Sequence, residues 1–226
     1  MYERFAHEYA SHAEDSAYNA LYDRPAMLGL AGDVRGRAVF DAACGPGFYA
    51  RELLERGARV TGCDVSPTFV DMARARCEGL ADLRVHDLAE PLTWVPDDSV
   101  DLVLFALALH YIDDRVGLLR EFRRILTSHG AVVLSTEHPF MHWVRLGGSY
   151  FTQVQVEESL DPDRDWPIRA WRRPLTAVCA DFREAGFVIE ELLEPRPVPE
   201  MAHRYPEDHA QLERLPAFIA FRLLPV

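Results

Sequence analysis

A loop with two glycines most constrains how this chain can fold. It begins with Gly45-Pro46-Gly47 and lies between an apolar segment and an amphipathic one. Together with Ala50 it matches the spacing G-x-G-x-x-G/A, in which the backbone of a strand-to-helix turn closely approaches a ligand. The spacing alone leaves open whether that ligand is a nicotinamide dinucleotide, a free phosphate or another molecule.

Strands and helices are expected to alternate around this loop. Short apolar segments predict strands, and segments that follow a capping residue or end at a glycine predict helices. The expected strands are residues 38–43, 58–63, 83–86, 100–106 and 131–136. The expected helices are residues 48–56, which end at Gly57, residues 67–77, which follow the N-cap Ser66, and about residues 114–126, capped by Asp113 or Asp114. This order predicts an α/β fold with a parallel sheet and helices on both faces.

The remaining segments extend this core at both ends. We expect one domain over residues 1–226, with an N-terminal helical lid over residues 1–35. Residues 137–171 and 194–214 lack a clear period and are expected to be irregular insertions. The other expected elements are a helix over residues 174–185 and strands over residues 187–193 and 217–224.

Composition and charge argue against several classes of protein. A net charge of −12 without an evident arginine cluster disfavours a nucleic-acid partner. No apolar run approaches the roughly 18 residues of a membrane span, and the charged N-terminus predicts no signal peptide, so we expect a cytoplasmic protein without membrane contact. The cysteines form no C-x-x-C pair, so no metal site is expected.

Three aspartates are expected to meet at one edge of the sheet. Asp41 is near the end of the first expected strand, and Asp64 and Asp87 follow the next two. The carboxyl ends of parallel strands share an edge, so these carboxylates should face one crevice. A carboxylate after the second strand can accept hydrogen bonds from both hydroxyls of a ribose. Asp41 would repel a pyrophosphate and attract a cationic ligand.

These charges favour S-adenosylmethionine (SAM) over a nicotinamide cofactor. SAM combines a cationic amino-acid end with a ribose and an adenine whose amino group Asp87 can bind. The chain contains no lysine, which removes the Tyr-x-x-x-Lys pair of an NAD-dependent oxidoreductase.

Residues 38–138 resemble the class I SAM-dependent methyltransferases. The family's motifs D-x-x-C-G-x-G and G-x-D-x-S are similar to DAACGPG and GCDVS of this chain, and its fourth and fifth motifs are similar to DDSVDLVLFALALHYIDD and GAVVLSTEHP. The resemblance implies a Rossmann-like seven-stranded sheet in the order 3-2-1-4-5-7-6, with strand 7 antiparallel. The chain departs from the family at Ala43, where the family usually has glycine.

The resemblance also implies roles for individual residues. The glycine loop would wrap the methionine part of SAM, Asp64 would hold the ribose hydroxyls, and Asp87 and Leu88 would contact the adenine. The full set of cofactor-binding residues implied in this way is Tyr9, Asp41, Ala43, Gly45, Gly47, Asp64, Val65, Asp87, Leu88, Phe105 and Ala106.

The acceptor side is less clearly defined by the sequence. His110 and His138 follow the fourth and fifth expected strands and are candidate general bases, because an imidazole titrates near neutral pH. Aromatic side chains suit a planar or apolar acceptor. The expected substrate-binding residues are Tyr22, Phe140, Trp143 and Trp171. The aromatic residues of the first insertion have an alternative role as a lid core or a dimer contact.

We therefore expect an enzyme that transfers a methyl group from SAM to an oxygen or nitrogen of a small aromatic or apolar metabolite, for example in natural-product tailoring. The alternative is a non-catalytic SAM-binding regulatory protein. The expected partners are a small-molecule acceptor and, if the protein is not a monomer, a second copy of the chain in a homodimer.

Overall fold

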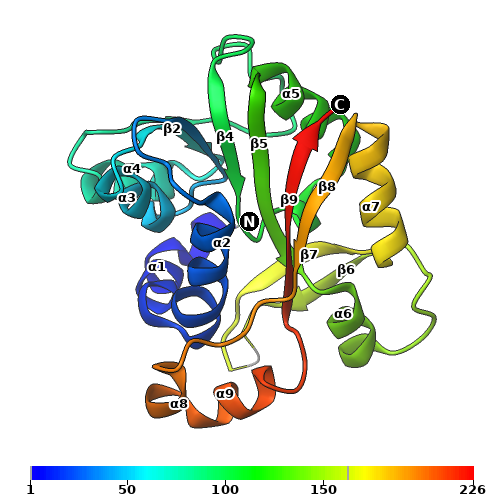
Figure 1. Cartoon of the computed structure of the whole chain (residues 1–226). Helices are drawn as coiled ribbons and strands as arrows, with labels where there is room; N and C mark the ends of the chain where they lie inside the picture. Colours follow the sequence, from blue (N-terminus) through cyan, green and yellow to red (C-terminus); the bar gives the residue numbers. More distant parts are fainter. Residues whose placement is uncertain (1, 162) are drawn as a thin grey trace.

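The structure, a computed structural model, is built around a seven-stranded sheet (Figure 1). It describes residues 2–161 and 163–226; Met1 and Pro162, in the expected lid and first insertion, lie outside the described residues. The sheet order is β3-β2-β1-β4-β5-β9-β8. The strands are β1 Ala38–Ala42, β2 Arg59–Asp64, β3 Asp82–Val85, β4 Val100–Phe105, β5 Leu126–Glu137, β8 Phe187–Leu193 and β9 Phe218–Pro225. Strand β9 is antiparallel to β5 and β8, and the other pairs are parallel, so the predicted order is confirmed.

Helices connect the strands and extend the fold at both ends. The α-helices are α1 Ala6–Asp15, α2 Arg24–Ala31, α3 Phe48–Glu55, α4 Pro67–Arg76, α5 Arg115–Ile125, α6 Pro139–Leu146, α7 Leu175–Glu184, α8 Met201–Arg204 and α9 Pro206–Leu212. Two 3-10 turns, Tyr2–Phe5 and Leu109–Tyr111, and a π-helical turn, Asn19–Asp23, complete them. Within the described residues, none of these helices combines the length and apolar character needed to cross a membrane.

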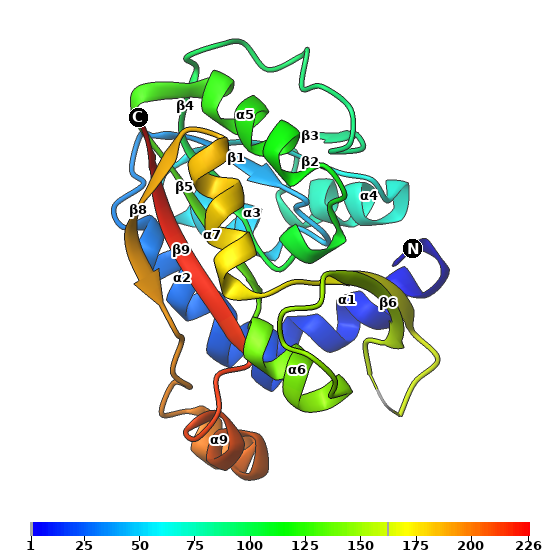
Figure 2. The ribbon, with the colours of Figure 1, turned by 90° about the vertical axis from the view of Figure 1, so that its right-hand side faces the viewer.

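Two apolar layers hold the helices to the sheet. Successive side chains of a strand point to opposite faces. Phe40 and Phe105 therefore pack with α5 and α7 on one face, and Val39 and Leu104 pack with α2, α3 and α4 on the other. Figure 2 shows α5 and α7 in front of the sheet and α2 and α3 behind it. Because both faces are covered, the central strands are buried and the carboxyl ends of the strands are left for ligands.

The helix boundaries follow the capping residues expected from the sequence. Ser66 Oγ accepts a hydrogen bond of 3.1 Å from the Phe69 backbone N–H, and Pro67 opens α4. Asp114 accepts one of 2.8 Å from Gly117 at the start of α5. Such caps satisfy backbone donors that have no partner within the helix.

The two insertions are more regular than expected. The first contains α6 and an antiparallel hairpin of β6 Val154–Ser159 and β7 Pro167–Arg172. The second contains α8 and α9. Strand β6 is polar and largely open to solvent, so it lacks the alternation of buried apolar residues that identifies a strand in a sequence.

Aromatic contacts connect the N-terminal segment to the first insertion. The rings of Phe5 and Trp166 are stacked with centroids 5.4 Å apart. The hydroxyls of Tyr2 and Tyr111 lie 2.7 Å apart, and the Tyr2 ring also packs against Phe69. Segments distant in the chain thus meet beside the carboxyl ends of the strands.

Candidate functional site

A cavity of about 400 Å³ lies at the carboxyl ends of β1, β2 and β4. The sheet order reverses between β1 and β4, which is where ligands bind in open α/β sheets. The predicted site residues that line the cavity are Tyr9, Ala43, Gly45, Asp64, Val65, Asp87, Leu88 and Ala106. Eight of the eleven expected cofactor-binding residues thus line this cavity.

The glycine loop is held in place by Asp64. Its Oδ2 accepts a 2.9 Å hydrogen bond from the Gly45 N–H, and its Oδ1 accepts one of 2.9 Å from the Ser66 N–H. Burial raises the pKa of the Asp64 carboxyl, and these backbone donors oppose that shift. Asp64 therefore connects the loop after β1 to the start of α4 while facing the cavity.

Gly47 is required at its position both by conformation and by space. Its φ is +85°, and a Cβ there would lie 2.7 Å from Ala73 Cα in α4. A side chain at positive φ costs roughly 1–2 kcal/mol, and the contact with α4 adds to this cost.

We expect Gly47→Ala to lower the free energy of unfolding by more than about 2 kcal/mol. Gly45→Ala is the control, because at φ +52° its Cβ meets no described atom within 4 Å beyond its chain neighbours. Equal urea denaturation midpoints for the two variants would contradict this account.

Asp41 lies beneath the loop rather than in the cavity. It is 1% exposed, and its Oδ2 has no hydrogen-bond partner among the described residues. Burial, with a further effect of the Asp64 charge, raises the pKa of Asp41 to about 8. Its predicted contact with the ammonium of a cofactor is not direct in this structure, and it stays a prediction.

The raised pKa of Asp41 makes stability depend on pH. The unfolded carboxyl titrates near pH 4, so between about 4 and 8 the folded chain binds one proton more than the unfolded chain. The contribution of this group is fully present below pH 4 and is lost as pH rises toward 8. In urea unfolding from pH 5 to 8, wild type should lose stability relative to Asp41→Asn. A constant difference between the two would contradict the shift.

Asp87 follows β3 and lines the cavity together with the glycine loop. Its Oδ1 accepts a 2.9 Å hydrogen bond from the Ala89 N–H, and its side chain lines the cavity with Leu88 and His86. Val65 is 59% exposed here, so an apolar surface is open to a ligand. An apolar side chain next to a hydrogen-bond acceptor suits a purine with an amino group.

The other end of the cavity was not predicted from the sequence. Asn19, Asp23, Arg24 and Tyr49 line it. Tyr49 donates a 2.5 Å hydrogen bond to Asp23, and the Arg24 guanidinium lies 4.8 Å from the Phe48 ring centroid. The buried Nε of Arg24 has no partner among the described residues. A guanidinium with an unused donor is suited to bind a carboxylate.

Comparison with known proteins identifies the family that this chain resembles. Residues 40–134 match the family described as a methyltransferase domain. The chain is 32% identical over 111 residues to malonyl-[acyl-carrier protein] O-methyltransferase from Serratia marcescens, covering 49% of this chain and 42% of that protein. It is 31% identical over 157 residues to trans-aconitate 2-methyltransferase from Escherichia coli, covering 67% of this chain and 57% of that protein. Both alignments span less than two thirds of the relative's length.

A solved structure is similar over most of the chain. An S-adenosylmethionine dependent methyltransferase from Mesorhizobium loti matches with a TM-score of 0.74 at 26% identity, covering 93% of this chain and 99% of that one. The chain belongs to the class I SAM-dependent methyltransferases. The cofactor of this methyltransferase is SAM.

The residues that line the cavity fit SAM by charge. Acceptors at Asp64 and Asp87 match the hydroxyls of a ribose and the amino group of an adenine. At the other end, the unpaired donor of Arg24 matches a carboxylate, and the neighbouring Asp23 matches an ammonium.

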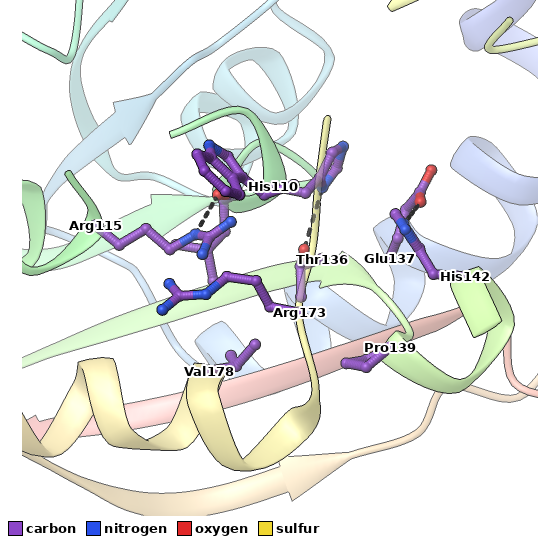
Figure 3. A pocket seen from close by; sticks show the side chains of 10 residues that line it. His110, Arg115, Thr136, Glu137, Pro139, His142, Arg173 and Val178 are labelled. Carbon is purple, nitrogen blue, oxygen red and sulfur yellow. Dashed lines mark hydrogen bonds and ion pairs between the residues drawn. The ribbon is translucent and has the colours of Figure 1, made fainter. Parts of the chain in front are cut away.

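A second cavity, of about 20 Å³, lies on the other side of the turn Leu109–Tyr111 (Figure 3). His110 lines it, and its Nδ1 lies 3.1 Å from Thr136 Oγ1. Burial lowers the pKa of His110 to about 4, so its imidazole is neutral at pH 7. Trp171 also lines this cavity, and its Nε1 donates a 2.6 Å hydrogen bond to Asp113.

Seven predicted residues line neither cavity, among them Asp41 and Gly47 described above and His138 described below. Tyr22 is 0% exposed and its hydroxyl accepts a hydrogen bond from the Ala217 N–H. Phe140 and Trp143 lie on α6, 36% and 38% exposed. The Phe105 ring packs against Phe122, because neighbouring strand residues face opposite sides of the sheet.

His138 has a structural role at the start of α6. Its Nδ1 accepts a 3.1 Å hydrogen bond from the Phe140 N–H, and its Nε2 lies 3.1 Å from Glu194 Oε1. Both ring nitrogens are therefore engaged, and the residue lines neither cavity. Its role as a base stays a prediction.

Proposed function

We propose that this methyltransferase transfers the methyl group of SAM to an oxygen or nitrogen of a small metabolite with an aromatic or apolar part. The observation that supports this is the group of tyrosines Tyr2, Tyr9 and Tyr111, which line the SAM cavity together with Ala106 and its neighbours. Aromatic side chains offer a large apolar surface to a planar ligand.

SAM, when bound, supplies an electrophilic methyl group on a sulfonium. The residues of the chain would hold it at both ends, with Arg24 at the carboxylate and Asp64 at the ribose. Closure by the N-terminal segment, through the Tyr2–Tyr111 and Phe5–Trp166 contacts, would exclude water. Alignment and water exclusion account for much of the rate of such a displacement.

His110 is the stronger candidate for a base that removes a proton from the acceptor. It lines the small cavity beside Thr136, whereas His138 lines neither cavity and both of its ring nitrogens are engaged. Turnover should fall in His110→Ala and be unchanged in the exposed control His129→Ala. Full turnover in both His110→Ala and His138→Ala would exclude these two histidines as the base.

The printed names of relatives indicate different acceptors, among them a malonyl-acyl-carrier protein, demethylmenaquinone and trans-aconitate. The acceptor class is therefore best tested directly. We would supply SAM labelled in its methyl group with a panel of aromatic hydroxyls, aromatic amines and aliphatic carboxylic acids. Transfer to aromatic acceptors is the expected result. Transfer to the aliphatic acids alone would overturn the acceptor class, and SAM binding without transfer to any compound would favour a non-catalytic role.

A further inference from the structure

Three side chains that could bind a metal ion meet next to the small cavity. They are Glu137 at the end of β5, His142 in α6 and Glu158 in β6. Each offers one ligand atom, and these atoms lie within 4.8 Å of one another. Glu137 contacts the Nε2 of His142, and Figure 3 shows the two side chains facing each other.

This group, the Glu137–His142–Glu158 cluster, is partly buried and incompletely paired. His142 is 3% exposed. Its Nδ1 and the Oε1 of Glu158 have no hydrogen-bond partner among the described residues. A buried polar atom without a partner is costly, so these atoms are suited to a ligand.

The charges of the cluster are also unbalanced. Arg145 lies 3.4 Å from Glu137 and 2.8 Å from Glu158, and it is the cation paired with both carboxylates. One guanidinium, whose side chain is 49% exposed, faces two carboxylates whose side chains are 14% and 13% exposed. A further positive charge would neutralise the remaining carboxylate.

We propose that Glu137, His142 and Glu158 bind a divalent cation of the Mn²⁺ or Zn²⁺ type. Imidazole and carboxylate ligands suit these ions, and three protein ligands leave a position open for another molecule. Atoms bound to one ion at about 2.1 Å are at most about 4.2 Å apart, so only a small movement of the side chains closes the site.

The location of the proposed metal site suggests a function for the ion in the reaction. Glu137 and His142 also line the small cavity with His110 and Trp171. An ion there could hold an oxygen of the acceptor and favour loss of its proton. This use rests on the proposed function, whereas binding of the metal does not.

The test is metal binding by the whole chain, stripped with a chelator, in the absence of SAM and acceptor. Mn²⁺ and Zn²⁺ are titrated by calorimetry, and thermal unfolding is followed with and without metal. We expect one ion per chain, a raised melting temperature and at least tenfold weaker binding in Glu158→Gln. In Arg145→Gln, which removes a competing cation, binding should be tighter.

The matched control is Glu157→Gln, since Glu157 is exposed on the same strand and lies outside the cluster. Its metal affinity should equal that of wild type. No binding by folded wild type, or equal binding by Glu158→Gln and wild type, would overturn the proposal. Methyl transfer is assayed separately, so an inactive protein that binds one ion would contradict the proposed function and leave the metal site supported.

Discussion

Replacing Asp64 by Ala is expected to weaken SAM binding by about 10- to 100-fold. Hydrogen bonds to a charged group contribute roughly 1.5–3 kcal/mol, and each 1.4 kcal/mol corresponds to about tenfold in affinity. Asp64 faces the cavity at the end of β2 and also holds the backbone N–H groups of Gly45 and Ser66. Its loss therefore removes a ligand contact and loosens the glycine loop.

Calorimetry with SAM measures this effect. Asp82→Ala is the control, because Asp82 is an exposed aspartate of the neighbouring strand β3 that pairs with Arg84 outside the cavity. Thermal unfolding of both variants separates loss of fold from loss of binding. An unchanged SAM affinity in folded Asp64→Ala would rule out the ribose contact.

Replacing Arg24 by Gln is expected to weaken SAM binding by about tenfold or more, while binding of 5′-methylthioadenosine should change little. That compound has the adenosine part of SAM but lacks the amino-acid carboxylate that the free Nε–H of the Arg24 guanidinium would bind. The comparison of two ligands isolates the carboxylate contact from any general damage to the cavity.

Arg76→Gln is the matched control for Arg24. Both guanidinium groups stack on the Phe48 ring, at 4.1 Å for Arg76 and 4.8 Å for Arg24, but of the two only Arg24 lines the cavity. Equal losses for SAM and 5′-methylthioadenosine in Arg24→Gln would refute the carboxylate assignment.

The fold could be predicted where the local sequence pattern of an element agrees with the alternating order of strands and helices. Apolar strands followed by capped helices mark the alternating core, and the cap at Ser66 and the turn at Gly57 lie where expected. The hairpin β6–β7 was missed because β6 is polar and has no buried face, although Ile168 and Ala170 of its partner β7 are buried.

The residues that line the candidate cofactor site could be predicted only in part, for a similar reason. Asp64 and Asp87 follow strands whose ends must share an edge, so sequence position determines where they lie. Arg24 reaches the cavity through the packing of a π-helical turn and α2 against the glycine loop, which no spacing in the sequence indicates. The Glu137–His142–Glu158 cluster likewise combines three elements, so no short motif reveals it.

The acceptor residues were the least predictable part. The aromatic character of a residue does not show whether it lines a cavity. Trp171 lines the small cavity, whereas Phe140 and Trp143 are partly exposed on α6. Tyr111 lines the SAM cavity because the turn Leu109–Tyr111 directs it there, beside Tyr2.

The most direct test of this account is calorimetric titration of the wild-type chain with SAM. We expect one SAM to bind per chain. S-adenosylhomocysteine has the same carboxylate, ribose and adenine, so it should compete with SAM and lower the apparent affinity for SAM. A folded chain that binds no SAM would contradict the assignment of the cavity and with it the proposed function.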